Sequence, residues 1–129
     1  MIRISYGFDS LPTIERPVVT IGSFDGVHRG HADLLRRVVE HSRRIGGRSV
    51  VVTFSPHPRE VLPRGGDFQL LTTIRRKAEL LEALGVDEMI VVEFSMEFAA
   101  LSSEGAFFCV KRPASLYRII KQKKPSHGQ

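Results

Sequence analysis

Apolar residues are concentrated in three short, nearly continuous runs along the chain. These runs cover residues 18–23, 49–54 and 89–94, and β-branched residues are frequent in them. Runs of this length that are apolar at almost every position are typical of strands buried on both faces of a sheet. The pattern therefore predicts three buried strands.

Between these runs lie two stretches in which apolar residues recur at helical spacing. The first, 31–45, stops at Gly46-Gly47, and the second begins at a capping threonine, Thr72 or Thr73, and ends at Gly85. Buried strands that alternate with helices predict an α/β fold, in which a doubly wound parallel sheet carries helices on both faces through right-handed crossovers. Ligands of such sheets bind beyond the carboxyl ends of the strands.

The loop that follows the first predicted strand has the chemistry of a phosphate site. Gly22, Gly26 and Gly30 open the backbone to close approach, and His28 and His31 lie where the first helix begins. Unpaired N–H groups in a first helical turn and the helix dipole attract anions, and two imidazoles add donors. Because a glycine stands between them, both rings can reach one phosphoryl group. The loop therefore indicates nucleotidyl transfer.

Other interpretations of the histidine pair stay open at this point. Histidines that cap a helix or lie on the surface explain most pairs with this spacing. The loop contains neither GxxxxGK[ST] nor GxGxxG, which excludes a P-loop and a dinucleotide fingerprint. A zinc site would need further ligands, but His41, His57 and Cys109 show no recognisable spacing, so no metal site is predicted.

A second candidate loop follows the second predicted strand. Pro56 and Pro58 restrict the backbone on both sides of His57, and a loop held in this way suits a planar ligand because little entropy remains to be lost. Arg59 either pairs with a phosphate group or is a solvated arginine. Farther along the chain, the basic cluster 75–77 is interpreted as a solvated helix face.

Composition narrows the classes of protein and partner. A chain of 129 residues, 42% of them hydrophobic, suits one domain with a single core. The net charge of +5 favours anionic partners. Because the basic residues are spread along the chain, we expect nucleotides rather than nucleic acid. No apolar run approaches the ~20 residues that span a bilayer, and no secretory signal is present, so we expect a cytoplasmic protein without a membrane partner.

Three blocks of sequence together resemble the bacterial bifunctional FAD synthetases, which join a riboflavin kinase domain to an FMN adenylyltransferase domain. The blocks are GSFDGVHRGH at 22–31, FSPHPREVL at 54–62 and the segment 71–87. HxGH alone marks the wider nucleotidyltransferase superfamily, whereas PHPRE is typical of the flavin branch. The resemblance covers about residues 17–104 and implies a Rossmann-like doubly wound parallel sheet of the HxGH superfamily, incomplete at the C-terminus.

The same resemblance implies an activity and a set of site residues. The enzyme would be an FMN adenylyltransferase (FAD synthase), which transfers AMP from ATP to FMN and gives FAD and pyrophosphate, with Mg²⁺ accompanying ATP. His28 and His31 would be the catalytic residues. The ATP-binding residues would be Gly22, Ser23, Phe24, Asp25, Gly26 and Gly30. The flavin-binding residues would be Pro56, His57, Pro58 and Arg59.

The resemblance is lost near Gly105. Residues 1–104 are interpreted as the N-terminal part of the FMN adenylyltransferase domain, and 105–129 as a basic tail that matches no part of the family. The family's serine-rich ISSTxIR motif and its kinase barrel have no counterpart here, so we expect a truncated member with impaired FAD production. The alternatives are a noncatalytic nucleotide- or flavin-binding remnant, or another HxGH nucleotidyltransferase.

Overall fold

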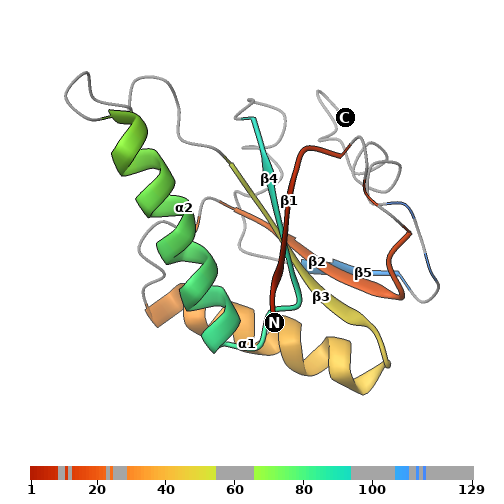
Figure 1. Ribbon diagram of the computed structural model, residues 1–129. Helices are drawn as coiled ribbons and strands as arrows, with labels where there is room; N and C mark the ends of the chain where they lie inside the picture. The colour runs from red at the N-terminus through yellow and green to blue at the C-terminus, as the bar shows by residue number, and fades with distance from the viewer. Residues whose placement is uncertain are drawn as a thin grey trace, which may run out of the picture.

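The computed structural model of the protein describes residues 1–8, 11, 13–22, 24, 29–54, 66–93, 107–110, 113 and 115. These residues form an α/β unit in which one sheet packs against two helices (Figure 1). The elements in chain order are β1 (Arg3–Tyr6), β2 (Pro17–Ile21), α1 (Arg29–Arg44), β3 (Arg48–Phe54), α2 (Gly66–Ala83), β4 (Glu88–Val92) and β5 (Phe107–Cys109).

The strands form one sheet of five with the order β1-β4-β3-β2-β5. Neighbours among β1, β4, β3 and β2 are parallel, and β5 pairs antiparallel with β2. The central strands β2, β3 and β4 are the three that the apolar runs predict, and every residue of β2 and β4 is buried. The prediction of an α/β fold with a mostly parallel sheet is therefore confirmed.

Both described helices pack on the same face of the sheet. The chain advances from β2 to β3 to β4 in one direction across the sheet, and right-handed crossovers that advance in one direction place their helices on one side. Inward side chains of both helices and alternate strand residues form one core cluster. Its members include Val18, Val51, Met89 and Val91 from the strands and Leu34, Leu35, Val38, Val39, Ile74, Ala78 and Leu81 from the helices.

The opposite face is buried in part by the connection from β1 to β2. This connection advances in the reverse direction, so a right-handed crossover brings it over the face that the two helices leave open. Phe8, Leu11 and Ile14 of the connection, together with Phe108 of β5, join the second core cluster there. Because the described helices cover one face, the doubly wound arrangement with helices on both faces stays a prediction.

Both helices end at a glycine in the left-handed region, as predicted. After α1, Gly46 has a φ of 70°, and the N–H groups of Gly46 and Gly47 donate to the carbonyls of Arg43 and Ser42. After α2, Gly85 has a φ of 96°, and the N–H groups of Gly85 and Val86 donate in the same pattern to Glu82 and Leu81. These paired bonds are Schellman motifs, which satisfy the last carbonyls of a helix.

The start of α2 differs from the prediction. The helix begins at Gly66, so Thr72 and Thr73 lie inside it and not at its first residue. Residues 67–71 are acceptable in a helix, and the glycine pair at 65–66 interrupts the pattern more strongly than a threonine does. The pattern also missed β1 and β5, which have four and three residues, too few for a period to be recognised.

Candidate functional site

The two predicted loops leave the sheet from neighbouring strands at the same edge. β2 ends at Ile21 and β3 at Phe54, and the parallel register pairs Ile21 with Val52. The N–H of Gly22 extends this pairing by donating to the carbonyl of Val52 at 3.0 Å. Since both strands point their carboxyl ends the same way, the loops that follow them begin side by side, where open α/β sheets bind ligands.

The backbone of Gly22 packs closely against the Phe24 ring just beyond β2. A Cβ atom at position 22 would lie 2.9 Å from Cε2 of the Phe24 ring, so this position needs a glycine. Phe24 has a φ of 51°, the left-handed region that side chains rarely adopt, and its ring is buried in the core cluster with Leu34 and Leu35. The predicted contact of Phe24 with ATP stays a prediction; the contacts described for its ring lie within the protein.

His31 lies in the first turn of α1. Helix α1 begins at Arg29, and its first turn carries no acidic residue, so no carboxylate of that turn competes with a bound anion for the N–H groups. The His31 ring is half-buried and meets the Phe24 ring edge to face, with 5.2 Å between ring centroids and 73° between planes. The backbone of Gly30 belongs to the same turn. Phe24 thus orients the His31 imidazole at the positive end of the helix.

Most of the other predicted site residues lie outside the described residues. They are Ser23, Asp25, Gly26 and His28 in the first loop and Pro56, His57, Pro58 and Arg59 in the second. Their roles, and the approach of His28 to His31, stay predictions.

Two properties of the part of the chain that the structure describes bear on metals and membranes. Its His, Cys, Asp and Glu side chains form no group of three or more that could hold a metal ion. Neither of its helices combines the length and apolar content that crossing a bilayer requires.

Sequence reasoning missed one polar contact beneath this edge of the sheet. The Lys77 ammonium is buried and donates to the hydroxyl of Thr53, with 3.2 Å between Nζ and Oγ1. The interpretation of the basic cluster as a solvated face therefore holds for Arg75 and Arg76, which are exposed, and is wrong for Lys77. Spacing could have found it, because Lys77 stands three residues after Ile74 and so lies on the buried stripe of α2.

A second missed cluster lies at the opposite edge, where strands begin. Glu88, the first residue of β4, is fully buried and accepts bonds from two arginines that begin β1 and β3. Nε and Nη2 of Arg3 lie 2.9 and 2.7 Å from the two carboxylate oxygens, and Nε of Arg48 lies 2.9 Å from Oε2. The hydrogen bond to Glu88, and then its negative charge, raise the pKa of Arg3. These two ion pairs connect β1, β3 and β4 at the end of the sheet away from the candidate site.

Comparison with known proteins places this geometry in a family. The FAD synthetase family profile matches residues 11–110. A bifunctional riboflavin kinase/FMN adenylyltransferase of Escherichia coli (strain K12) is 40% identical over 104 residues, which are 81% of this chain and 33% of the relative. The protein of the same name from Listeria monocytogenes is 39% identical over 88 residues, 67% of this chain and 28% of that one. The chain therefore spans about a third of the length of these relatives.

A solved structure shares the fold. The crystal structure titled macrolide-efflux protein from Streptococcus pneumoniae superposes with a TM-score of 0.57 at 23% identity, covering 81% of this chain and 39% of that one. The family match extends over both candidate loops and all the strands that position them, from β2 through β5. The chain belongs to the FAD synthetase family.

Proposed function

We propose that this chain binds ATP and FMN as an FMN adenylyltransferase domain and transfers AMP from ATP to FMN. The observation that carries the proposal is His31 in the first turn of α1, at the edge where β2 and β3 end. Membership of the FAD synthetase family supports it. The finer description of the fold as a doubly wound HxGH sheet belongs to the same proposal.

In the proposed reaction, a phosphate oxygen of FMN attacks the α-phosphorus of ATP. The new bond joins the FMN oxygen to the α-phosphorus, and the bond from that phosphorus to the bridging oxygen breaks, so pyrophosphate leaves with the electron pair. Such a displacement needs positioning and charge stabilisation more than covalent catalysis. The N–H groups of the first turn of α1 and the His31 imidazole would donate to phosphate oxygens as their charge grows.

The remaining roles follow from the family and from the positions of the loops. His28 would act with His31 on the same phosphates, and the glycines at 22, 26 and 30 would allow close approach. The loop that begins after Phe54 would hold the flavin through His57 and the prolines beside it. Mg²⁺ would arrive on the ATP phosphates, because it keeps several waters and binds mainly through substrate oxygens.

Thermal unfolding with and without ligand tests the binding step. A ligand that binds only the folded state stabilises it by about 2.7 kcal/mol at a hundred times its Kd, so ATP with Mg²⁺ and FMN should each raise the Tm. His31→Ala should reduce the ATP shift and leave most of the FMN shift. His41→Ala is the matched control, because His41 lies near the other end of α1 and packs against Phe107. Equal ATP shifts in the two variants would refute the role of His31.

Chromatography of the protein incubated with ATP, FMN and Mg²⁺ tests the chemical step. We expect slow FAD formation, because a helix terminus contributes only about 0.3–2 kcal/mol whereas enzymes lower barriers by about 8–23 kcal/mol. FAD that does not depend on His31 would contradict the assignment of the site. Binding of both ligands with no FAD at all would favour a noncatalytic nucleotide- and flavin-binding domain.

A further inference from the structure

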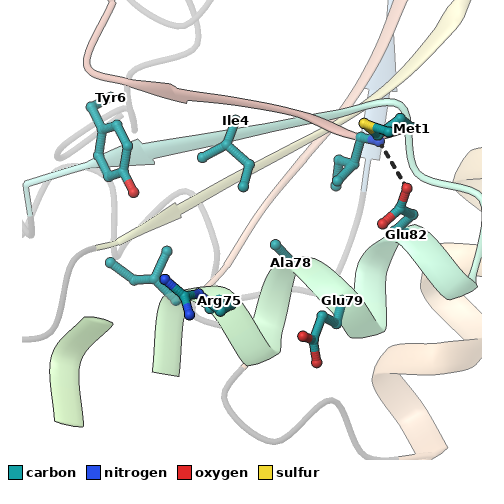
Figure 2. Close-up of a pocket in the computed structure, with 9 residues that line it drawn as sticks. Met1, Ile4, Tyr6, Arg75, Ala78, Glu79 and Glu82 are labelled. Carbon is teal, nitrogen blue, oxygen red and sulfur yellow. Dashed lines mark hydrogen bonds between the residues drawn. The ribbon is translucent and has the colours of Figure 1, made fainter. Parts of the chain in front are cut away.

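A groove lies on the molecule away from the candidate site, between β1 and α2. Its volume is about 430 Å³, and its lining comes from β1 on one side and α2 on the other. Figure 2 shows Ile4 and Tyr6 of β1 above Arg75 and Ala78 of α2, with Met1 beside Glu82. The groove therefore has an apolar interior with charged side chains from α2 along its rim.

The strand beside this groove is the exposed end of the described sheet. β1 pairs with β4 on one side, and the described sheet order ends with it. The large hydrophobic side chains that are exposed in the described part of the chain all lie on or next to this strand: Met1, Ile4 (40% exposed) and Tyr6 (65% exposed). An edge strand with apolar side chains is a template for pairing with another strand.

The direction of the backbone groups of β1 determines which pairing is possible. The N–H of Arg3 donates to the carbonyl of Asp87, just before β4, at 3.0 Å, and the N–H of Gly7 donates to the carbonyl of Val91 in β4 at 2.8 Å, so the odd-numbered residues bond inward. The N–H and C=O groups of Ile4 and Tyr6 consequently point away from the sheet. At Ile2 the outward N–H donates to Glu82 Oε2 at 3.3 Å, so this N–H is already bonded within the same copy.

We propose that this edge binds a second copy of the chain, with the two β1 strands antiparallel and Ile4 opposite Ile4 of the second copy. Even-numbered residues of one copy then lie opposite even-numbered residues of the other, so the N–H and C=O groups that point away from each sheet can bond to each other. Ile4 N–H donates to Ile4 C=O across the axis, and Tyr6 N–H donates to Ile2 C=O, without disturbing the bond from Ile2 to Glu82.

The same register matches side chains on both faces of the strand. On the face toward α2, Ile4 meets its own copy and Ile2 meets Tyr6, which are favourable apolar cross-strand pairs. On the other face Arg3 meets Ser5, so like charges are not opposed. A twofold axis makes one patch complementary to itself, as in most homodimers.

Charge on α2 argues for a second copy rather than another partner. Arg75 lies at the end of the groove near Tyr6, and Glu82 lies at the end near Met1 (Figure 2). A twofold axis at the level of Ile4 exchanges these ends, which brings Arg75 toward Glu82 of the second copy twice. Glu79, which lies between them on α2 and also lines the groove, pairs with Arg76 of its own copy at 3.3 Å. An interface with matched opposite charges steers association and rejects other partners.

Sedimentation of the full chain over a wide range of concentration tests the proposal. We expect reversible conversion from one copy to two as concentration rises. Ile4→Lys should leave only single copies, because a lysine on an edge strand prevents pairing. Its fold is checked by circular dichroism, and Arg75→Glu gives a second test at an exposed helix position.

Charge-reversal variants distinguish this interface from nonspecific hydrophobic association. Arg75→Glu and Glu82→Lys should each weaken dimer formation at least about tenfold, and the double variant should regain much of it. Arg37→Glu, an equal charge change at an exposed position of α1, should have no effect. The proposal is overturned if the chain stays single at every concentration, if Ile4→Lys still dimerises, or if the double variant is no better than the singles.

Discussion

Replacing Glu88 by glutamine should destabilise the fold strongly, although the two side chains have nearly the same shape. The Glu88 carboxylate is fully buried and accepts three hydrogen bonds of 2.7–2.9 Å from Arg3 and Arg48. An amide offers one oxygen in place of two and directs N–H donors at guanidinium donors. At least one of the three bonds must be lost, and two arginines are left without a negative partner.

The magnitude follows from how much of this cluster is buried. Breaking a fully buried ion pair costs about 3–5 kcal/mol, because the charge that remains is desolvated. Here the arginine side chains are 51% and 42% exposed, so water can solvate them once the carboxylate is gone. We therefore expect a loss of about 2–3 kcal/mol, which corresponds to a fall in Tm of roughly 10 °C for a domain of this size.

Urea denaturation of the wild type and Glu88→Gln measures this difference, provided that the dependence of the unfolding free energy on urea stays the same. Glu79→Gln is the matched control, since Glu79 pairs with Arg76 at 3.3 Å with both side chains more than half exposed. Its cost should be about 0.5 kcal/mol or less. If both variants lost the same small amount, burial would not explain the strength of the Glu88 cluster.

Three further predictions concern other parts of the fold. Gly85→Ala should lower the Tm more than Gly46→Ala. Both substitutions force alanine into a left-handed conformation, but only at Gly85 would the new Cβ meet a side-chain carbon, Cγ1 of Val39, at 3.2 Å. Equal decreases in Tm would contradict this. Lys77→Met should lower the unfolding free energy by about 1–3 kcal/mol, because it removes a buried hydrogen bond that the Thr53 hydroxyl accepts; an unchanged urea midpoint would contradict it. Phe24→Ala should cost about 3–5 kcal/mol and broaden the NMR signals of His31, whereas sharp His31 signals would show that the contact is dispensable.

The central strands and the helix ends could be predicted because local signals and the fold agree there. The strands 17–21, 48–54 and 88–92 are buried on both faces, so apolar residues occupy nearly every position and indicate strands in the sequence itself. Gly46 and Gly85 mark helix ends because left-handed geometry strongly favours glycine. The position of the candidate site at the carboxyl ends of the first two buried strands follows from the same pattern.

Other features could not be predicted because distant residues determine them. β1 has exposed and half-buried residues and becomes a strand only through pairing with β4. The strand 107–109 lies in a segment without a helical or alternating pattern, and pairing with β2 gives it structure. Arginines that flank a buried glutamate leave no local signature, since Arg3, Arg48 and Glu88 are far apart in the sequence.

The left-handed backbone conformation of Phe24 connects the stability of the core to the geometry of the candidate site. A left-handed conformation costs a residue with a side chain about 1–2 kcal/mol, whereas burying a phenylalanine ring contributes about 1.5–3 kcal/mol. With a φ of 51° and an exposure of 3%, Phe24 combines both effects, so burial of its ring can hold its backbone in the left-handed conformation. The same ring contacts His31, and Gly22 leaves space for it. Any substitution that loosens the ring should therefore release the left-handed conformation of Phe24 and the orientation of the imidazole together.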